Sequence, residues 1–360
     1  TLFPYTTLFR SHDQEVLCDF SRAYKREISK ARRGYTDQFI YKLRNLKAKD
    51  PKEYWKLLNM TGKHGLSRPI TNLALYEHFK TLASDPSDNV TEDAHVNASY
   101  NLLFSDTHCE VLDQVITVEE IKKVIHGLKN NKSAGADSII NEYIRASEDL
   151  LVPVYVKLFN RILDTGVFPS LWLKGCIIPL FKNKGDPSDP SNYRGITLLS
   201  CLGKVFTSIM NNRLTEFSDT NHILLENQTG FRKSYSTMDH IFLIKNIIDM
   251  YLSKSKKLYC AFVDYRAAFD SISRSNLWLK MLDAGIKGKL VQVIYNMYQG
   301  IKSCVLHNGV KSEYFPSLRG VRQGENLSPF LFAIYVNDLE NFMNDYNVAS
   351  LKFPDEYTAR

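Results

Sequence analysis

The chain has 360 residues, of which 44% are hydrophobic, 12% aromatic and 24% charged. Its mean hydropathy is −0.26. At roughly 150 residues per domain, this length indicates two domains or one large one. The abundant aromatic residues exclude a chain that is disordered throughout, and no apolar run approaches the roughly 18 residues that a membrane-spanning helix needs. The six cysteines are scattered without a CxxC pair, which is typical of reduced thiols rather than of a disulfide scaffold or a structural zinc site.

The net charge of +7 is concentrated in one segment. Residues 22–56 contain 12 Lys or Arg and four Asp or Glu, so this segment carries the whole positive excess of the chain. A solvated basic helix is the simpler interpretation. A contact surface for a polyanion is the alternative, because Lys and Arg replace the counterions that condense on phosphates.

The two ends of the sequence are abrupt. Residues 1–11 (TLFPYTTLFRS) look like the in-frame translation of a sequencing-library adapter, and we leave them out of the fold prediction. A natural extended arm is the alternative. Arg360 follows a candidate strand within a few residues, so we interpret the sequence as a fragment of a longer product.

The first half of the chain has mostly helical patterns. Residues 12–60 are basic, with apolar side chains at helical spacing, whereas residues 83–98 are polar and predict a linker or long loop. Thr117 and Glu120 form a capping box ahead of a helix that should end near residues 130–135. A second helical pattern, which begins near Leu151, stops at the glycine and proline that follow it.

A β-hairpin is predicted next. Apolar runs over 176–181 and 195–200 flank a turn cluster at 182–190. Lys182, Lys184 and Arg194 place positive charge around this flexible loop, as a triphosphate site requires. Solvated side chains on a surface turn are the usual alternative for such a cluster.

Two acidic segments are candidates for metal binding. Residues 258–265 (LYCAFVDY) predict a strand that ends in Asp264, and a buried carboxylate there needs a cation, either a metal ion or Arg266. Two-metal phosphoryl transfer requires carboxylates from two strands that converge on ions about 4 Å apart. Residues 351–356 offer the second carboxylate pair, and a frayed acidic terminus is the alternative for them.

A glycine-bracketed loop lies between these acidic segments. Residues 320–324 (GVRQG) would let the backbone approach a ligand closely, or would simply form a tight turn. Ser328 and Pro329 then predict the start of a helix, with a capping hydroxyl and proline at its first position. Because helices and strands mix without a steady βαβ rhythm, the sequence predicts an α+β fold.

Taken in order, these motifs resemble the reverse transcriptase of non-LTR (LINE-type) retrotransposons over roughly residues 115–356. The succession is KSAGAD at 132–137, IPLFK at 178–182, NYRGI at 192–196, QTGFR at 228–232, AFVD at 261–264, AFD at 268–270, GVRQG at 320–324, LSP at 327–329 and FPDE at 353–356. The resemblance implies a polymerase right-hand fold, with helical and hairpin fingers over 101–257 and an antiparallel-sheet palm over 258–360. The thumb and the endonuclease of the family are expected to be absent, and residues 12–100 correspond to the connector and linker.

The resemblance also implies a role for each matching residue. Asp264 corresponds to the first metal-binding aspartate, with the carbonyl of Tyr265 as a further ligand, and Asp355 and Glu356 correspond to the second catalytic pair. Phe269 matches the bulky residue that excludes a 2′-hydroxyl. The remaining correspondences are Lys182, Arg194, Gln323 and Gly324 for nucleotide binding, and Phe231 and Arg232 for the template.

The last motif departs from the family pattern, which is aromatic-Ala-Asp-Asp. Pro354 removes a backbone donor from a tight hairpin, and Glu356 adds a methylene where the family has a second Asp. We therefore expect weak or no processive activity from this sequence.

The leading hypothesis is an RNA-directed DNA polymerase that uses an RNA template, a DNA primer, dNTPs and two Mg²⁺ ions, with Mn²⁺ as a substitute. The alternative is an inactive remnant that only binds nucleic acid, and a metal-dependent nuclease using Asp264 and Asp355 ranks last. No membrane partner is expected. We expect an intracellular location, nuclear or in a cytoplasmic ribonucleoprotein, although no targeting signal is visible.

Overall fold

The computed structural model of the chain describes residues 70–84 and 108–345, together with scattered residues between 22 and 45. The chain divides into two compact units, Thr1–Ser67 and Arg68–Arg360. In the first unit, the described residues between 22 and 45 are helical and exposed, as the basic pattern predicts. The predicted linker beyond residue 84 and the terminal motif at 353–356 lie outside the described residues.

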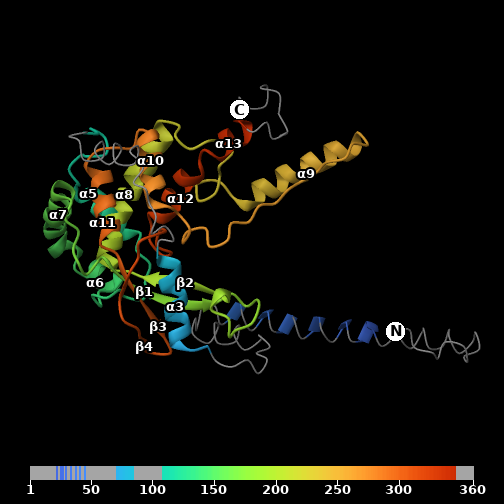
Figure 1. The fold of residues 1–360 in the computed structure, drawn as a ribbon, viewed down its shortest axis with the longest axis horizontal. Coiled ribbons are helices and arrows are strands. Elements are labelled where there is room, and N and C mark those ends of the chain that lie inside the picture. Colours follow the sequence, from blue (N-terminus) through green and yellow to red (C-terminus); the bar gives the residue numbers. More distant parts are fainter. Residues whose placement is uncertain are drawn as a thin grey trace, which may run out of the picture. The chain divides into compact units, whose positions relative to one another are not determined.

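The second unit combines helices with one mixed sheet (Figure 1). Its helices are α3 (Asn72–Ala83), α5 (Val118–His126), α6 (Asn141–Ala146), α7 (Glu148–Thr165), α8 (Cys201–Thr220), α9 (Thr237–Ser253), α10 (Arg274–Asp283), α11 (Lys289–Gln299), α12 (Ser328–Val336) and α13 (Leu339–Asp345). Its strands are β1 (Lys174–Phe181), β2 (Tyr193–Leu198), β3 (Lys302–His307), β4 (Val310–Lys311) and β5 (Phe315–Pro316), and a 3₁₀ turn, Pro190–Asn192, precedes β2.

The larger hydrophobic core lies between helices. It contains the buried faces of α5, α7, α8, α10, α11 and α12, with Phe159, Phe206 and Trp278 among its largest side chains. The predicted capping box starts α5: the Glu120 N–H donates to the Thr117 hydroxyl oxygen at 3.3 Å, and the Thr117 N–H donates to the Glu120 carboxylate at 3.0 Å. This confirms that local sequence fixes the start of the helix.

The sheet has the strand order β2-β1-β3-β4, with β5 also paired to β3. The β1–β2 pair is antiparallel, with Phe181 opposite Tyr193, which confirms the predicted hairpin. The β1–β3 pair is parallel, with Cys176 opposite Cys304. The sheet of the described residues is therefore mixed rather than antiparallel, and the division into fingers and palm stays a prediction.

Helix α3 covers one face of this sheet and forms a second, smaller core (Figure 1). Leu75 and Phe79 of α3 are buried against Ile177 of β1, Val305 of β3 and Phe315 of β5. A Cβ at Gly195 of β2 would lie 2.7 Å from the Phe79 ring. The close approach of α3 to the hairpin thus depends on that glycine.

Two local predictions were wrong. Residues 258–265 do not form a strand and their side chains are exposed, apart from Leu258, because no described strand supplies the hydrogen-bonding neighbour that a strand needs. The helix at Pro329 starts as predicted, but Leu327 occupies its N-cap and no side chain caps it. Ser328 is already the first helical residue, so its hydroxyl is not in the capping position.

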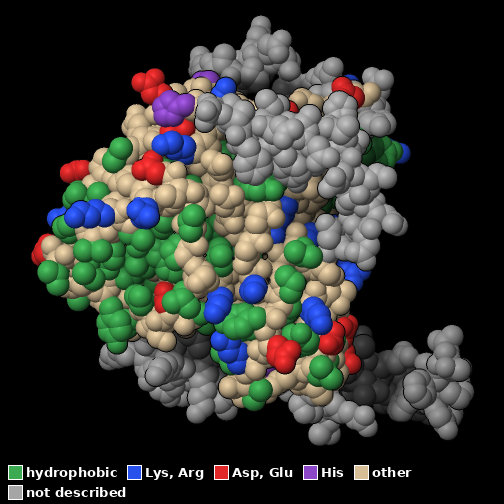
Figure 2. Space-filling view, turned by 60° about the vertical axis from the view of Figure 1, so that its left-hand side comes forward, with side chains coloured by type: hydrophobic (Ala, Val, Ile, Leu, Met, Phe, Trp, Pro, Cys, Tyr) green, Lys and Arg blue, Asp and Glu red, His purple; other side chains and the backbone are tan. Residues whose placement is uncertain are grey.

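Large apolar side chains remain exposed on several helices, and Figure 2 shows such areas between scattered Lys and Arg side chains. Helix α9 buries none of its side chains among the described residues, and its Ile241 and Phe242 are 59% and 69% exposed. Among the helices that the structure describes, none has the length and apolar character that crossing a lipid bilayer demands.

Candidate active site

One open cleft of about 750 Å³ gathers residues from separate parts of the sequence. Its walls include residues of α3, the hairpin turn, strand β2, the segment 264–270 and the loop at 323–324. Of the residues predicted for the site, the cleft is lined by Lys182, Arg194, Phe231, Asp264, Phe269, Gln323 and Gly324. Arg232 does not line it, and Asp355 and Glu356 lie outside the described residues.

The β1–β2 hairpin supplies two of the cations that line the cleft, Lys182 and Arg194, and Arg266 lines it as well. The Lys182 N–H donates to the Asn192 carbonyl at 2.8 Å, and the Lys182 ammonium donates to the Ser191 carbonyl at 2.8 Å. The side chain of Asp189 accepts the Ser191 N–H at 2.8 Å, which closes the turn. The Lys182 and Arg194 side chains are both exposed on the cleft wall. A polyanionic ligand that enters the cleft can therefore contact both side chains directly.

The loop over residues 320–324 is attached by its backbone on two sides. The Thr197 N–H of β2 donates to the Gln323 carbonyl at 2.8 Å, and the Val321 N–H donates to the Phe269 carbonyl at 2.9 Å. Gly324 has φ of 112°, and a Cβ there would lie 2.6 Å from the Thr197 carbonyl oxygen. Only glycine fits both constraints, so the glycine of the motif fixes how closely the loop approaches β2.

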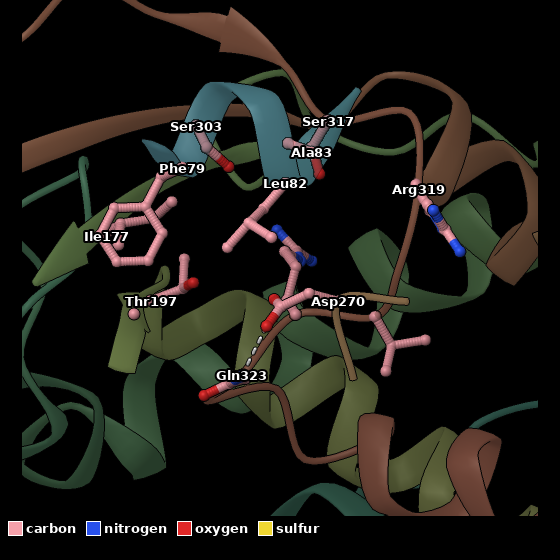
Figure 3. A pocket seen from close by; sticks show the side chains of 13 residues that line it. Phe79, Leu82, Ala83, Ile177, Thr197, Asp270, Ser303, Ser317, Arg319 and Gln323 are labelled. Carbon is pink, nitrogen blue, oxygen red and sulfur yellow. Dashed lines mark hydrogen bonds between the residues drawn. The ribbon is translucent and has the colours of Figure 1, made fainter. Parts of the chain in front are cut away.

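Asp270 is a cleft residue to which the sequence analysis gave no role. Its carboxylate accepts a hydrogen bond from the Gln323 side-chain amide at 3.1 Å (Figure 3). Burial raises the pKa of the Asp270 carboxyl to about 6, and the Gln323 hydrogen bond and the charge of Lys182 offset only part of that shift. No sequence signal identifies this, because a carboxylate in a turn is usually solvated and its partner is far along the chain.

Four aromatic rings meet beside Asp264. Phe231, which adopts a left-handed φ of 64°, lies 5.9 Å from the Phe269 ring, and Phe269 lies 5.3 Å from Phe332 of α12. Tyr265 contacts Phe332 edge-on at 6.4 Å. The side chain predicted to exclude a 2′-hydroxyl is thus supported by rings from two other segments. No role at the site was predicted for Phe332, because an apolar residue in an apolar helix indicates only core packing.

A buried ion pair between Arg322 and Glu325 stabilises the 320–324 loop. The Arg322 guanidinium donates to the Glu325 carboxylate at 2.8 Å, and both side chains are at most 5% exposed. The Thr207 hydroxyl of α8 donates to the other Glu325 oxygen at 2.5 Å. Because the pair is desolvated, loss of either partner would leave an uncompensated charge.

Arg274 fixes the segment that leads into the loop. Its buried guanidinium donates to the backbone carbonyls of Tyr298, Ser317, Arg319 and Gly320, at 2.7 to 3.2 Å. Burial lowers the pKa of the Arg274 guanidinium to about 10, which still leaves it charged at neutral pH. The residue therefore joins α10 and α11 to the segment over residues 317–320.

Arg232 turns away from the cleft and stabilises its own loop. Its guanidinium donates to the Leu225 carbonyl at 3.2 Å and lies 4.9 Å from the centre of the Tyr235 ring. An ion pair with Asp219 at 3.9 Å adds to this. A contact of Arg232 with a template stays a prediction.

Asp264 lines the cleft and is exposed, contrary to the expectation of a buried strand-end carboxylate. Its carboxylate oxygens are of the hard donor type that Mg²⁺ prefers, and they face a solvent-filled space. Among the residues that the structure describes, no group of three acidic, His or Cys side chains could hold a metal ion. The donor chemistry fits a divalent ion, and the predicted second ligand, Asp355, lies beyond the described ranges.

Comparisons with known proteins show which family the sequence resembles. Residues 181–358 match the family described as reverse transcriptase (RNA-dependent DNA polymerase). The RNA-directed DNA polymerase from mobile element jockey of Drosophila melanogaster is 30% identical over 224 residues, which are 62% of this chain and 24% of that protein.

Other mobile elements give similar matches. The jockey protein of Drosophila funebris is 30% identical over 226 residues, 63% of this chain and 25% of the relative. The retrovirus-related Pol polyprotein from type-1 retrotransposable element R2 of Nasonia vitripennis is 28% identical over 225 residues, 61% of this chain and 20% of the relative. The chain thus spans about a quarter or less of the length of these relatives, and its residues 181–358 carry the match to the reverse transcriptase family, with relatives among the non-LTR retrotransposons.

Proposed function

We propose that this chain supplies the polymerase centre of an RNA-directed DNA polymerase, which adds nucleotides to a primer 3′-hydroxyl on an RNA template. A single observation carries the proposal: residues of six separate motifs, predicted from sequence alone, line one cleft. A cleft of about 750 Å³ has room for a nucleotide, and the exposed cations Lys182 and Arg194 of the hairpin provide positive charge for a triphosphate.

Each wall of the cleft has its own task in this proposal. Lys182 and Arg194 bind and orient the triphosphate, Arg194 through its planar fork and Lys182 as a point charge. Phe269, held by Phe332, closes the space where a ribose 2′-hydroxyl would lie and so favours dNTPs. Gln323 and Gly324 present polar groups and backbone to the nascent base pair. This geometry holds the reactants in place, which is the main contribution a protein makes to phosphoryl transfer.

The family generally uses divalent ions, and two Mg²⁺ ions bound through Asp264 and Asp355 complete the proposed centre. When bound, such ions would activate the primer hydroxyl and stabilise the charge on the phosphorus centre. The exposed Asp264 carboxylate contributes negative charge to the same cleft that Lys182 and Arg194 line.

Primer extension on poly(rA)/oligo(dT) with Mg²⁺ or Mn²⁺ tests the proposal. We expect short products that disappear in Asp264→Ala, while Asp283→Ala, which alters an exposed acid at the end of α10, extends like the wild type. Template–primer affinity, measured by fluorescence anisotropy, should be unchanged in both variants. Binding without any extension would support the inactive remnant that only binds nucleic acid, and extension that survives Asp264→Ala would refute the proposed centre. Robust long products would contradict our expectation of weak processivity.

A further inference from the structure

The hydrogen bond between Asp270 and Gln323 connects the two sides of the cleft. Asp270 follows directly after Phe269, and Gln323 belongs to the 320–324 loop, 53 residues further along the chain. Both side chains line the cleft, and both also line a smaller cavity of about 40 Å³ behind it (Figure 3). The bond therefore lies at the boundary between the nucleotide space and the protein interior.

The backbone on each side of this hydrogen bond is fixed. The Gly320 N–H donates to the Ile272 carbonyl at 3.0 Å, and the Val321 N–H donates to the Phe269 carbonyl at 2.9 Å. A Cβ at Gly320 would lie 2.9 Å from the Asp270 Cα, so the loop rests directly on the turn that carries Asp270. The side-chain bond forms between two segments that are already in register, which makes it preorganised.

Positively charged side chains near Asp270 favour its ionised form, and this sets which group donates the hydrogen bond. Lys182, which directly follows β1, acts on the carboxylate from the hairpin, while Arg319, next to the loop, and Arg322, within it, line the small cavity. An ionised carboxylate can only accept, so the amide nitrogen of Gln323 must turn toward Asp270. The amide oxygen of Gln323 is then turned away from Asp270 and is free to accept a hydrogen bond from a ligand in the cleft.

We propose that Asp270 is a positioning residue for nucleotide recognition: it holds the Gln323 amide so that its oxygen, and not its nitrogen, meets the nascent base pair. The inference rests on the proposed polymerase function and adds to it a residue that determines orientation. It predicts that Asp270 affects nucleotide affinity only through Gln323. The two residues should therefore behave as a single unit when both are changed.

A dead-end complex tests this without requiring catalysis. The full chain binds an RNA/DNA template–primer whose primer ends in a dideoxynucleotide, and the correct dNTP is titrated with Mg²⁺ while anisotropy reports the complex. Asp270→Ala and Gln323→Ala should each weaken dNTP binding roughly tenfold, since a hydrogen bond to a charged group is lost in each. The double variant should also be weaker by roughly tenfold, whereas template–primer affinity without dNTP stays at the wild-type value.

A second set of variants, in which the donor and the acceptor exchange places, keeps the test valid if Asp270→Ala does not fold. Gln323→Glu places two carboxylates together and should weaken dNTP binding, and adding Asp270→Asn should restore the bond with opposite polarity and recover part of the affinity. Asp283→Ala is the matched control.

The inference is wrong if the losses of dNTP affinity in the two single variants multiply to roughly a hundredfold in the double variant. It is also wrong if Asp270→Ala binds dNTP with wild-type affinity. Either result leaves the polymerase centre intact. A wild type that binds no template–primer or no dNTP would instead refute the proposed function, and the inference with it.

Discussion

Asp270→Asn should make the protein more stable at neutral pH, because it removes a partly buried charge from the cleft. The pKa of Asp270 is raised from 3.8 to about 6. Between about pH 4 and 6 the folded protein keeps this proton while the unfolded chain has lost it, so the free energy of unfolding falls as pH rises through that window. A shift of about 2 pH units corresponds to about 3 kcal/mol at neutral pH. Because the cleft admits solvent, this figure is an upper limit for the variant.

Urea denaturation at pH 7.5 and at pH 4.5 measures the effect. We expect the free energy of unfolding of Asp270→Asn to exceed that of the wild type by up to about 3 kcal/mol at pH 7.5 and by clearly less at pH 4.5. Asp283→Asn, at an exposed position, should show no such dependence on pH. If the advantage is the same at both pH values, or if the variant is less stable at pH 7.5, then burial does not raise the pKa of this carboxyl and the reasoning fails.

Three further changes test the supports of the cleft. Gly324→Ala should lower the free energy of unfolding by about 1–3 kcal/mol, because Gly324 has a left-handed φ and lies against β2. Gly230→Ala, which has open space around it, should not lower it. Equal urea midpoints for the two variants would contradict this. Arg274→Met leaves four backbone carbonyls without their donor and should cost about 3 kcal/mol or more in the same assay, against no measurable loss for the exposed Arg161→Met. Phe269→Ala should raise the ratio of rNTP to dNTP affinity in the dead-end complex, and an unchanged ratio would remove Phe269 from sugar selection.

The sequence predicted those elements whose signals are local. The capping box at Thr117, the glycine and proline that end α7, and the turn cluster between β1 and β2 each act within a few residues, and the structure has an element boundary at each. Most of the residues to which the family resemblance gave a role line one cleft, although Arg232 does not and their roles stay predictions, because the resemblance carries spatial information that composition does not contain.

The failures concern features that depend on distant partners. The apolar run 258–265 has the composition of a strand, but strand formation also requires a neighbour, and none of the described strands pairs with it. The shifted pKa of Asp270 depends on burial by the 320–324 loop, and the role of Phe332 depends on a ring more than 60 residues earlier. Sequence spacing contains no signal for either, since both arise only when the segments pack together.

The attachment of the 320–324 loop to both β2 and the 269–272 turn also affects the order in which the newly synthesised chain folds. Its two backbone partners are synthesised well before the loop itself, so on the ribosome the hairpin can form while the cleft still lacks one wall. Closing contacts over such long stretches of chain is slow compared with helix formation. Nucleotide binding is therefore expected only after the loop has been synthesised and has packed onto β2 and the 269–272 turn.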